Sequence, residues 1–165
     1  MRYLIDEYHC DPMDTDRNED TVLHRAADYG KLDVIKYLIN YHHCDPMATN
    51  NEGETALHKA AAKYNSPDVI KYLINECNCD PMAVDRRGWT PLHNSADCGH
   101  SVAVECLLST GKCDPLAKDN EGRTPLQLAQ ERQQKGGNNT LPIFKKFGDI
   151  KSSHPIDSYV NVLLV

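Results

Sequence analysis

The fold is decided by the segment Asp85-Arg86-Arg87-Gly88-Trp89-Thr90-Pro91-Leu92-His93, which ends in the tetrad Thr-Pro-Leu-His. Similar tetrads recur along the chain at a regular interval. The related tetrads are Thr21-Val22-Leu23-His24, Thr55-Ala56-Leu57-His58 and Thr124-Pro125-Leu126-Gln127. A second motif, Cys-Asp-Pro, begins at residues 10, 44, 79 and 113, at intervals of 34, 35 and 34 residues. Two independent motifs that share one period indicate an internal structural repeat.

Each repeat carries the signals of a short helix that begins at the threonine of the tetrad. Threonine is a favourable N-cap residue, and Pro91 and Pro125 occupy the first helical position, where a missing N–H costs nothing. The histidine falls at the third helical position, and Gln127 completes a capping box there in the last repeat. Gly30 and Gly99 are placed to end the helix in a left-handed conformation.

A second helix is predicted in each repeat from paired apolar residues at helical spacing, as in residues 34–39. In the second repeat this helix opens with Ser66 as N-cap and Pro67 at the first helical position. The following Asp-Pro cannot continue a helix, and a polar turn such as 50–53 comes next. Residues 141–147 predict the second helix of the last repeat.

The tetrads at this period resemble the ankyrin-repeat family over about residues 3–131. The resemblance implies an all-α solenoid of helix–turn–helix units joined by β-turn or hairpin loops. Departures from the family pattern are Cys-Asp-Pro-Met in place of Ala-Asp-Val-Asn, and Asn94-Ser95 in place of Leu-Ala. Because the chain begins inside a second helix, we expect it to be a piece of a longer array. The predicted organisation is a partial leading repeat at 1–15, repeats at 16–49, 50–84 and 85–118, a divergent capping repeat at 119–148, a linker at 149–156 and an apolar strand-like tail at 157–165.

Composition argues against several classes of protein. The 165 residues are 40% hydrophobic, which is enough for one continuous core. The apolar runs are too short for a transmembrane helix, and the acidic start leaves no room for a signal peptide. A net charge of −6 argues against nucleic acid as a partner. We therefore expect a protein that does not associate with membranes and is located in the cytoplasm, with the nucleus as the alternative. We also expect it to be a monomer.

The seven cysteines and eight histidines invite a metal or redox hypothesis. Cys10, Cys44, Cys79 and Cys113 occupy one repeat position, however, so successive thiols lie too far apart to share a zinc ion with bonds of about 2.3 Å. We interpret them as reduced structural thiols, with a metal or redox site at Cys77 and Cys79 as the alternative. The tetrad histidines lack a nucleophile or carboxylate at a fixed spacing, so we interpret them as capping residues that tie one repeat to the next. The sequence predicts no catalytic residue, metal site or cofactor.

The resemblance implies a module that binds a protein partner, whose identity the sequence does not specify. In ankyrin solenoids the turn tips and the first helices line one concave face. Aromatic and arginine side chains interrupt an otherwise polar set on this face, and these residue types dominate binding hot spots. For Trp89 the alternative is packing against the neighbouring turn. The predicted partner-binding residues are Arg17, Asp28, Tyr29, Lys63, Tyr64, Arg86, Arg87, Trp89, Asp97 and Arg123.

Residues 157–165 contain a mostly apolar, β-branched run that is too short for a helix. The run resembles the first buried strand of a P-loop NTPase, which would make the chain the regulatory or recognition arm of a nucleotide hydrolase. The other two hypotheses are a strand packed on the repeats and a C-terminal ligand for a PDZ-type groove, anchored by Leu163 and Val165. The chain itself is predicted not to be an enzyme.

Overall fold

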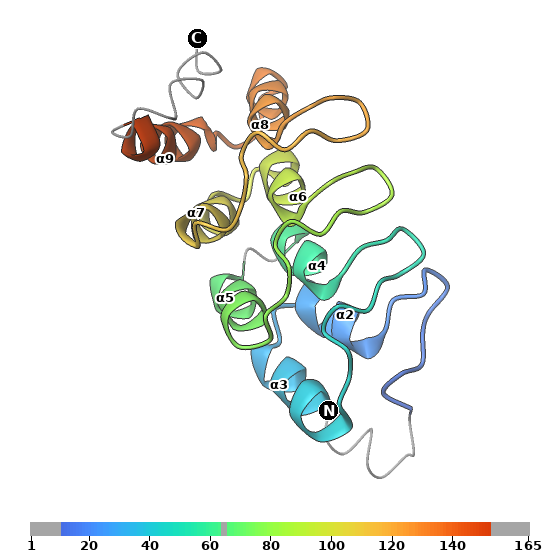
Figure 1. Cartoon of the computed structure of the whole chain (residues 1–165). Coiled ribbons are helices and arrows are strands. Elements are labelled where there is room, and N and C mark those ends of the chain that lie inside the picture. The colour runs from blue at the N-terminus through green and yellow to red at the C-terminus, as the bar shows by residue number, and fades with distance from the viewer. Residues whose placement is uncertain (1–10, 64–65, 153–165) are drawn as a thin grey trace.

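The computed structural model describes residues 11–63 and 66–152, with side chains described as far as Gly148. Within these residues the chain forms eight α-helices in four consecutive pairs (Figure 1). The first helices of the pairs are α2 (Val22–Asp28), α4 (Ala56–Ala62), α6 (Pro91–Cys98) and α8 (Pro125–Gln134). The second helices are α3 (Leu32–His42), α5 (Pro67–Asn75), α7 (Ser101–Ser109) and α9 (Leu141–Ser152).

The helices form two stacked layers, with the long turns projecting from the layer of first helices (Figure 1). In one layer α2 contacts α4, α4 contacts α6, and α6 contacts α8. In the other layer α5 contacts α7 and α7 contacts α9. In the described part of the chain, β-structure is limited to one isolated bridge between Thr15 and Thr21. The predicted all-α solenoid is therefore confirmed.

The threonine of each tetrad caps the first helix, as the sequence predicts. The hydroxyl of Thr55 accepts a hydrogen bond from the backbone N–H of His58 over 3.5 Å, and the His58 Nδ1 atom accepts one from the Thr55 N–H over 3.1 Å. All four tetrads form this reciprocal capping box, with the Gln127 side chain in the histidine's role in the last one. Each box satisfies two backbone donors that a helix start would otherwise leave without a partner.

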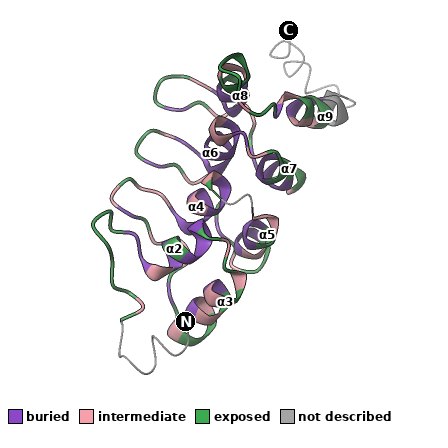
Figure 2. Cartoon of the chain, turned by 180° about the vertical axis from the view of Figure 1, so that it is seen from behind, coloured by how far each residue is buried: buried purple, intermediate pink, exposed green. Residues whose placement is uncertain are grey.

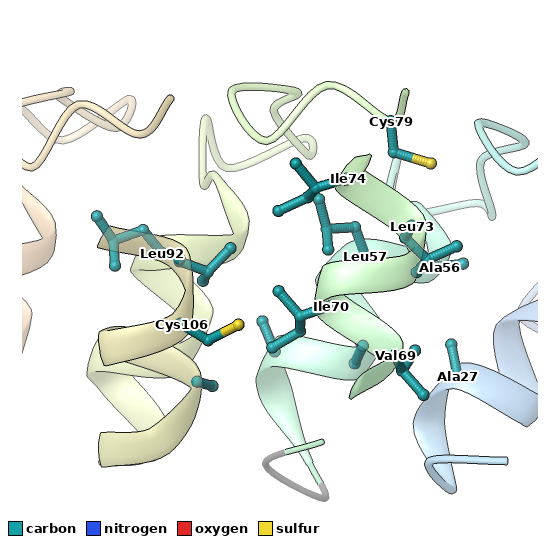
Figure 3. Close-up of a cluster of buried hydrophobic side chains, with 14 of the residues drawn as sticks. Ala27, Ala56, Leu57, Val69, Ile70, Leu73, Ile74, Cys79, Leu92 and Cys106 are labelled. Atoms are coloured by element: carbon teal, nitrogen blue, oxygen red, sulfur yellow. The ribbon is translucent and has the colours of Figure 1, made fainter. Parts of the chain in front are cut away.

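The core lies between the two layers and runs without a break along the stack (Figure 2). Figure 3 shows Ile70 and Ile74 of α5 among apolar side chains of their own repeat and the next, including Leu57 and Leu92. These four side chains are fully buried. Alanines on the first helices, such as Ala27, are also buried and let neighbouring helices approach closely. Because each repeat buries its apolar face only against its neighbours, the stack shares one core.

Several details differ from the expected boundaries or fall outside the described residues. Helix α9 continues to Ser152 and so includes the first four residues of the stretch predicted as a linker. Ser66 is the N-cap of α5, but its side chain makes no capping hydrogen bond. The tail at 157–165, and with it all three hypotheses for its role, lies outside the described residues. Among the helices that the structure describes, none has the length and apolar character needed to cross a bilayer.

Candidate protein-binding surface

The long turns before the first helices are shaped by one carboxylate or amide at the start of each repeat. The Oδ1 atom of Asp85 accepts hydrogen bonds from the backbone N–H groups of Arg87 (2.8 Å) and Trp89 (2.9 Å). Asp16, Asn50 and Asp119 make the same two contacts in their own turns. These hydrogen bonds fix the turn without a β-ladder, so the side chains carried by the turn have defined positions.

Neighbouring turns are joined by direct backbone hydrogen bonds. The Arg86 N–H donates to the Glu52 carbonyl over 2.9 Å, and equivalent bonds connect the turns on either side. The tetrad histidines add a second connection, because His58 Nε2 donates to the Trp89 carbonyl of the next repeat over 2.9 Å. His24 and His93 reach the next repeat in the same way. The predicted role of these histidines in tying repeats together is therefore confirmed.

A first cluster of candidate binding residues, the Trp89 cluster, lies between the third and fourth repeats. The Trp89 indole is 8% exposed, and its Nε1–H donates to Asp119 Oδ2 over 2.9 Å. The Arg87 guanidinium lies 3.9 Å from the centre of the indole ring and donates twice to Asp85 Oδ2. Arg123 lies 6.0 Å from the same ring and pairs with Asp119 over 3.1 Å. The indole thus packs on the neighbouring turn while supporting an exposed arginine.

A second cluster, the Tyr29 cluster, lies at the ends of α2 and α4. Lys63 Nζ is 3.0 Å from Asp28 Oδ2 and 5.0 Å from the centre of the Tyr29 ring. Arg25 pairs with the same Asp28 carboxylate over 3.8 Å, and more closely with Asp16. Tyr29 is half exposed, whereas Asp28 is buried. The arrangement repeats that of the Trp89 cluster, with a buried carboxylate, an aromatic ring and an exposed cation.

A charged pair between the two clusters is more deeply placed. Lys59 Nζ lies 2.7 Å from Glu54 and 3.5 Å from Asp20. Burial alone would raise the pKa of Glu54, but hydrogen bonds from Lys59 and Asn50 outweigh it and hold that pKa below its usual value.

The carboxyl group of Asp119 in the Trp89 cluster behaves in the same way. Burial favours its neutral form, yet the backbone N–H of Arg123 and the Trp89 indole lower its pKa. Both carboxylates are therefore charged at neutral pH.

The family described as "Ankyrin repeats (3 copies)" matches the chain over residues 1–85 and again over residues 59–141. The chain belongs to the ankyrin-repeat family. A search of curated proteins found no significant match. The two matched ranges together include every tetrad and all four described helix pairs except most of α9. The resemblance that the tetrads indicate is thus confirmed.

The ankyrin repeats bring most of the predicted partner-binding residues onto one surface, made of the long turns and of α2, α4, α6 and α8, which we call the inner surface. Arg17, Tyr29, Lys63, Arg86 and Arg87 are exposed there. Asp97 and Arg123 are half-buried, whereas Asp28 and Trp89 are buried beneath exposed cations. Tyr64 lies outside the described residues.

Sequence reasoning missed four charged residues of this network, namely Arg25, Lys59, Asp85 and Asp119. Arg25 and Lys59 directly follow the tetrad histidines and contribute to the charged network, and their common repeat position is the signal that could have identified them. The buried carboxylates Asp85 and Asp119 also share a position, 34 residues apart. Their pairing with particular arginines depends on contacts within and between turns that a periodic pattern does not specify.

Four of the described cysteines, Cys44, Cys79, Cys106 and Cys113, are buried. The Sγ atoms of Cys79 and Cys106 lie 3.8 and 3.7 Å from backbone carbonyls of Pro46 and Pro67 in preceding segments. Burial raises the pKa of the Cys79 thiol to about 12. Among the described residues no three His, Cys, Asp or Glu side chains come together as metal ligands would. Cys10 lies outside the described residues.

Proposed function

We propose that this chain binds a protein partner through the inner surface of its ankyrin repeats, as a scaffold or recognition module. Ankyrin repeats in general mediate protein–protein interactions. The observation that carries the proposal for this surface is the geometry of Arg87. Its guanidinium is stacked on the Trp89 ring and tethered to the buried Asp85, while half of the side chain is exposed.

Such an arginine suits recognition because its position is fixed before a partner arrives. Holding a long side chain in one conformation reduces the rotamer entropy that binding would otherwise cost. Arginine and aromatic residues are the types that dominate binding energy at interfaces. Tyr29, with Lys63 above its ring, provides a second site of the same kind on the same surface. The predicted monomeric state and the location in the cytoplasm or nucleus belong to this proposal.

The test measures the affinity of a partner isolated with the intact chain. We expect Arg87→Ala combined with Tyr29→Ala to weaken binding by about 2 kcal/mol or more. Lys71→Ala combined with Tyr41→Ala provides a matched control, because these residues are exposed on α5 and α3 in the other layer. Circular dichroism and urea unfolding establish that both variants are folded. An unchanged affinity in the first variant, or an equal loss in the control, would contradict the proposal.

A further inference from the structure

We infer that the partner segment recognised by the inner surface is acidic and extended, with carboxylates that contact Lys63 and Arg87 at the same time. The inference rests on the proposed function and specifies its partner. It starts from an asymmetry in exposure. The side chains of Arg87 and Lys63 are 50% and 48% exposed, whereas the side chains of the carboxylates that anchor them, Asp85 and Asp28, are 0% and 9% exposed.

A partner that reaches the inner surface therefore meets cations, with their anchoring carboxylates behind them. Among the residues that the structure describes, the Arg87 guanidinium donates to Asp85 through Nε and Nη2, so the N–H groups on its Nη1 side can donate to another acceptor. Carboxylates, like phosphates, form strong charge-assisted hydrogen bonds with a guanidinium or an ammonium group. The two aromatic rings further limit how far these cations can move.

The separation of the two cations determines the shape of the segment. Lys63 follows the end of α4, whereas Arg87 lies in the turn before α6 and approaches Glu54 near the start of α4 to 3.8 Å. One repeat spacing of about 10 Å and the length of α4, about 10 Å, give a diagonal of roughly 15 Å. An extended chain of four residues at roughly 3.3 Å each, with the reach of its side chains, covers this distance, and an even separation places both carboxylates on the same face.

The surrounding charges favour a peptide over a nucleic acid. The exposed carboxylates of Glu52 and Glu121 lie at the tips of the turns on either side of Arg87. A continuous polyphosphate would approach these carboxylates as well as the cations, and the chain as a whole has a net charge of −6. A peptide with two carboxylates at the right spacing contacts Lys63 and Arg87 and presents neutral groups to the turn tips.

The test uses the full chain and three synthetic ten-residue peptides of serine and glycine. One carries two glutamates four residues apart, and the others carry glutamine or lysine at those positions. Trp89 is the chain's one tryptophan, so its indole N–H signal and the Arg87 Nε–H signal in NMR spectra report binding at this site. We expect the glutamate peptide to shift both signals and to bind at least about fivefold more tightly than the glutamine peptide. Higher salt should weaken its binding.

Variants locate the binding site. Lys63→Gln and Arg87→Gln should each weaken binding of the glutamate peptide about threefold or more, since each removes one ion pair. Lys36→Gln and Lys71→Gln on α3 and α5 remove the same charge from the other layer and should leave the affinity unchanged. The inference is overturned if the glutamate peptide does not bind at millimolar concentration, if the glutamine or lysine peptide binds as tightly, or if the control variants weaken binding equally.

Three further outcomes show which of the two claims fails, the inference or the proposed function. A ten-nucleotide single-stranded DNA that binds more tightly than the glutamate peptide, through Lys63 and Arg87, would overturn the inference in favour of a polyphosphate. If Arg87→Ala with Tyr29→Ala abolishes binding of an isolated protein partner while the three peptides bind equally, the proposed function stands and the acidic segment is wrong. If that pair of substitutions leaves the isolated partner's affinity unchanged, the proposed function itself fails.

Discussion

The Nε1–H of Trp89 donates to Asp119 Oδ2 over 2.9 Å, from the turn of the third repeat to the turn of the fourth. The two groups are buried together, and the carboxylate gives the single indole donor its partner. The same carboxylate pairs with Arg123 and accepts two backbone N–H groups of its own turn. Trp89 thus links the third and fourth turns of the inner surface through Asp119, and its ring also lies beneath the Arg87 guanidinium.

Trp89→Phe keeps an aromatic ring beneath Arg87 and removes the indole donor. We expect it to lower the free energy of unfolding by about 1–3 kcal/mol, because a hydrogen bond to a buried charged group is lost. Urea unfolding followed by circular dichroism measures the change. Tyr41→Phe alters an exposed side chain in the other layer and should change stability by less than about 0.5 kcal/mol. Equal stability of Trp89→Phe and the parent chain would contradict this account of the Trp89–Asp119 contact.

The stability of the repeats should fall on mild acidification because of His58 and His93. Burial lowers the pKa of both rings below the ordinary value of 6.5. The unfolded chain therefore takes up protons as the pH falls below about 6.5, while the folded chain does not, and folding becomes less favourable. We expect a loss approaching about 1.4 kcal/mol per pH unit for each histidine between pH 6.5 and the lower folded-state pKa. Thermal unfolding midpoints between pH 7.5 and 5 measure this slope.

His58→Gln isolates the contribution of one ring, since Gln127 already forms the capping box in the fourth repeat with its Oε1 atom 2.8 Å from the Thr124 N. The variant should lose about 1 kcal/mol at pH 7.5 with the hydrogen bond to Trp89. Its slope between pH 6.5 and 5 should be shallower than that of the parent chain. A slope equal to the parent's would show that the acid sensitivity arises elsewhere.

Two glycines at the same position of neighbouring repeats differ in their surroundings. Gly88 and Gly122 have φ angles of +76° and +77°. A Cβ atom on Gly88 would lie 2.6 Å from the Asn120 side chain and 2.9 Å from its backbone N, whereas a Cβ atom on Gly122 would have no neighbour within 4 Å. Gly122→Ala should therefore cost only the backbone strain of about 1–2 kcal/mol. Gly88→Ala should cost clearly more, as measured by urea unfolding, and equal losses would be inconsistent with the contact between these turns.

The reactivity of the cysteine thiols should follow their burial. Cys77 and Cys98 are half-buried, whereas Cys44, Cys79 and Cys113 are buried. Burial raises the pKa of Cys79 to about 12, so its thiolate is scarce at pH 8. We expect Cys79 to be alkylated at least about tenfold more slowly than Cys77 in the native chain, with the difference lost in 8 M urea. Mass spectrometry of timed digests assigns the rates, and native Cys79 reacting as fast as Cys77 would contradict the structural role.

The period and the tetrads predicted α2, α4, α6 and α8 because a capping box is a local interaction among four consecutive residues. The links made by His24, His58 and His93 were also predictable, since the same residue recurs at the same position. The packing of Trp89 on the neighbouring turn was only one of two hypotheses, because it depends on Asp119, which lies 30 residues away. The pairing of Lys63 with Asp28 likewise depends on two repeats packing side by side. A periodic pattern specifies which elements form, whereas these contacts depend on the side chains that differ between repeats.

The hydrogen bonds from turn to turn have a mechanical consequence. Within the described ranges, each turn is hydrogen-bonded to the turns next to it, through contacts such as Arg86 N–H to the Glu52 carbonyl. A pulling force applied between the ends of the array would therefore load these junctions in series, and the weakest junction would open first. Each released repeat of 34 residues would add about 110 Å of contour length. A partner bound across Lys63 and Arg87 would span the junction between the second and third repeats and raise the force at which that junction opens.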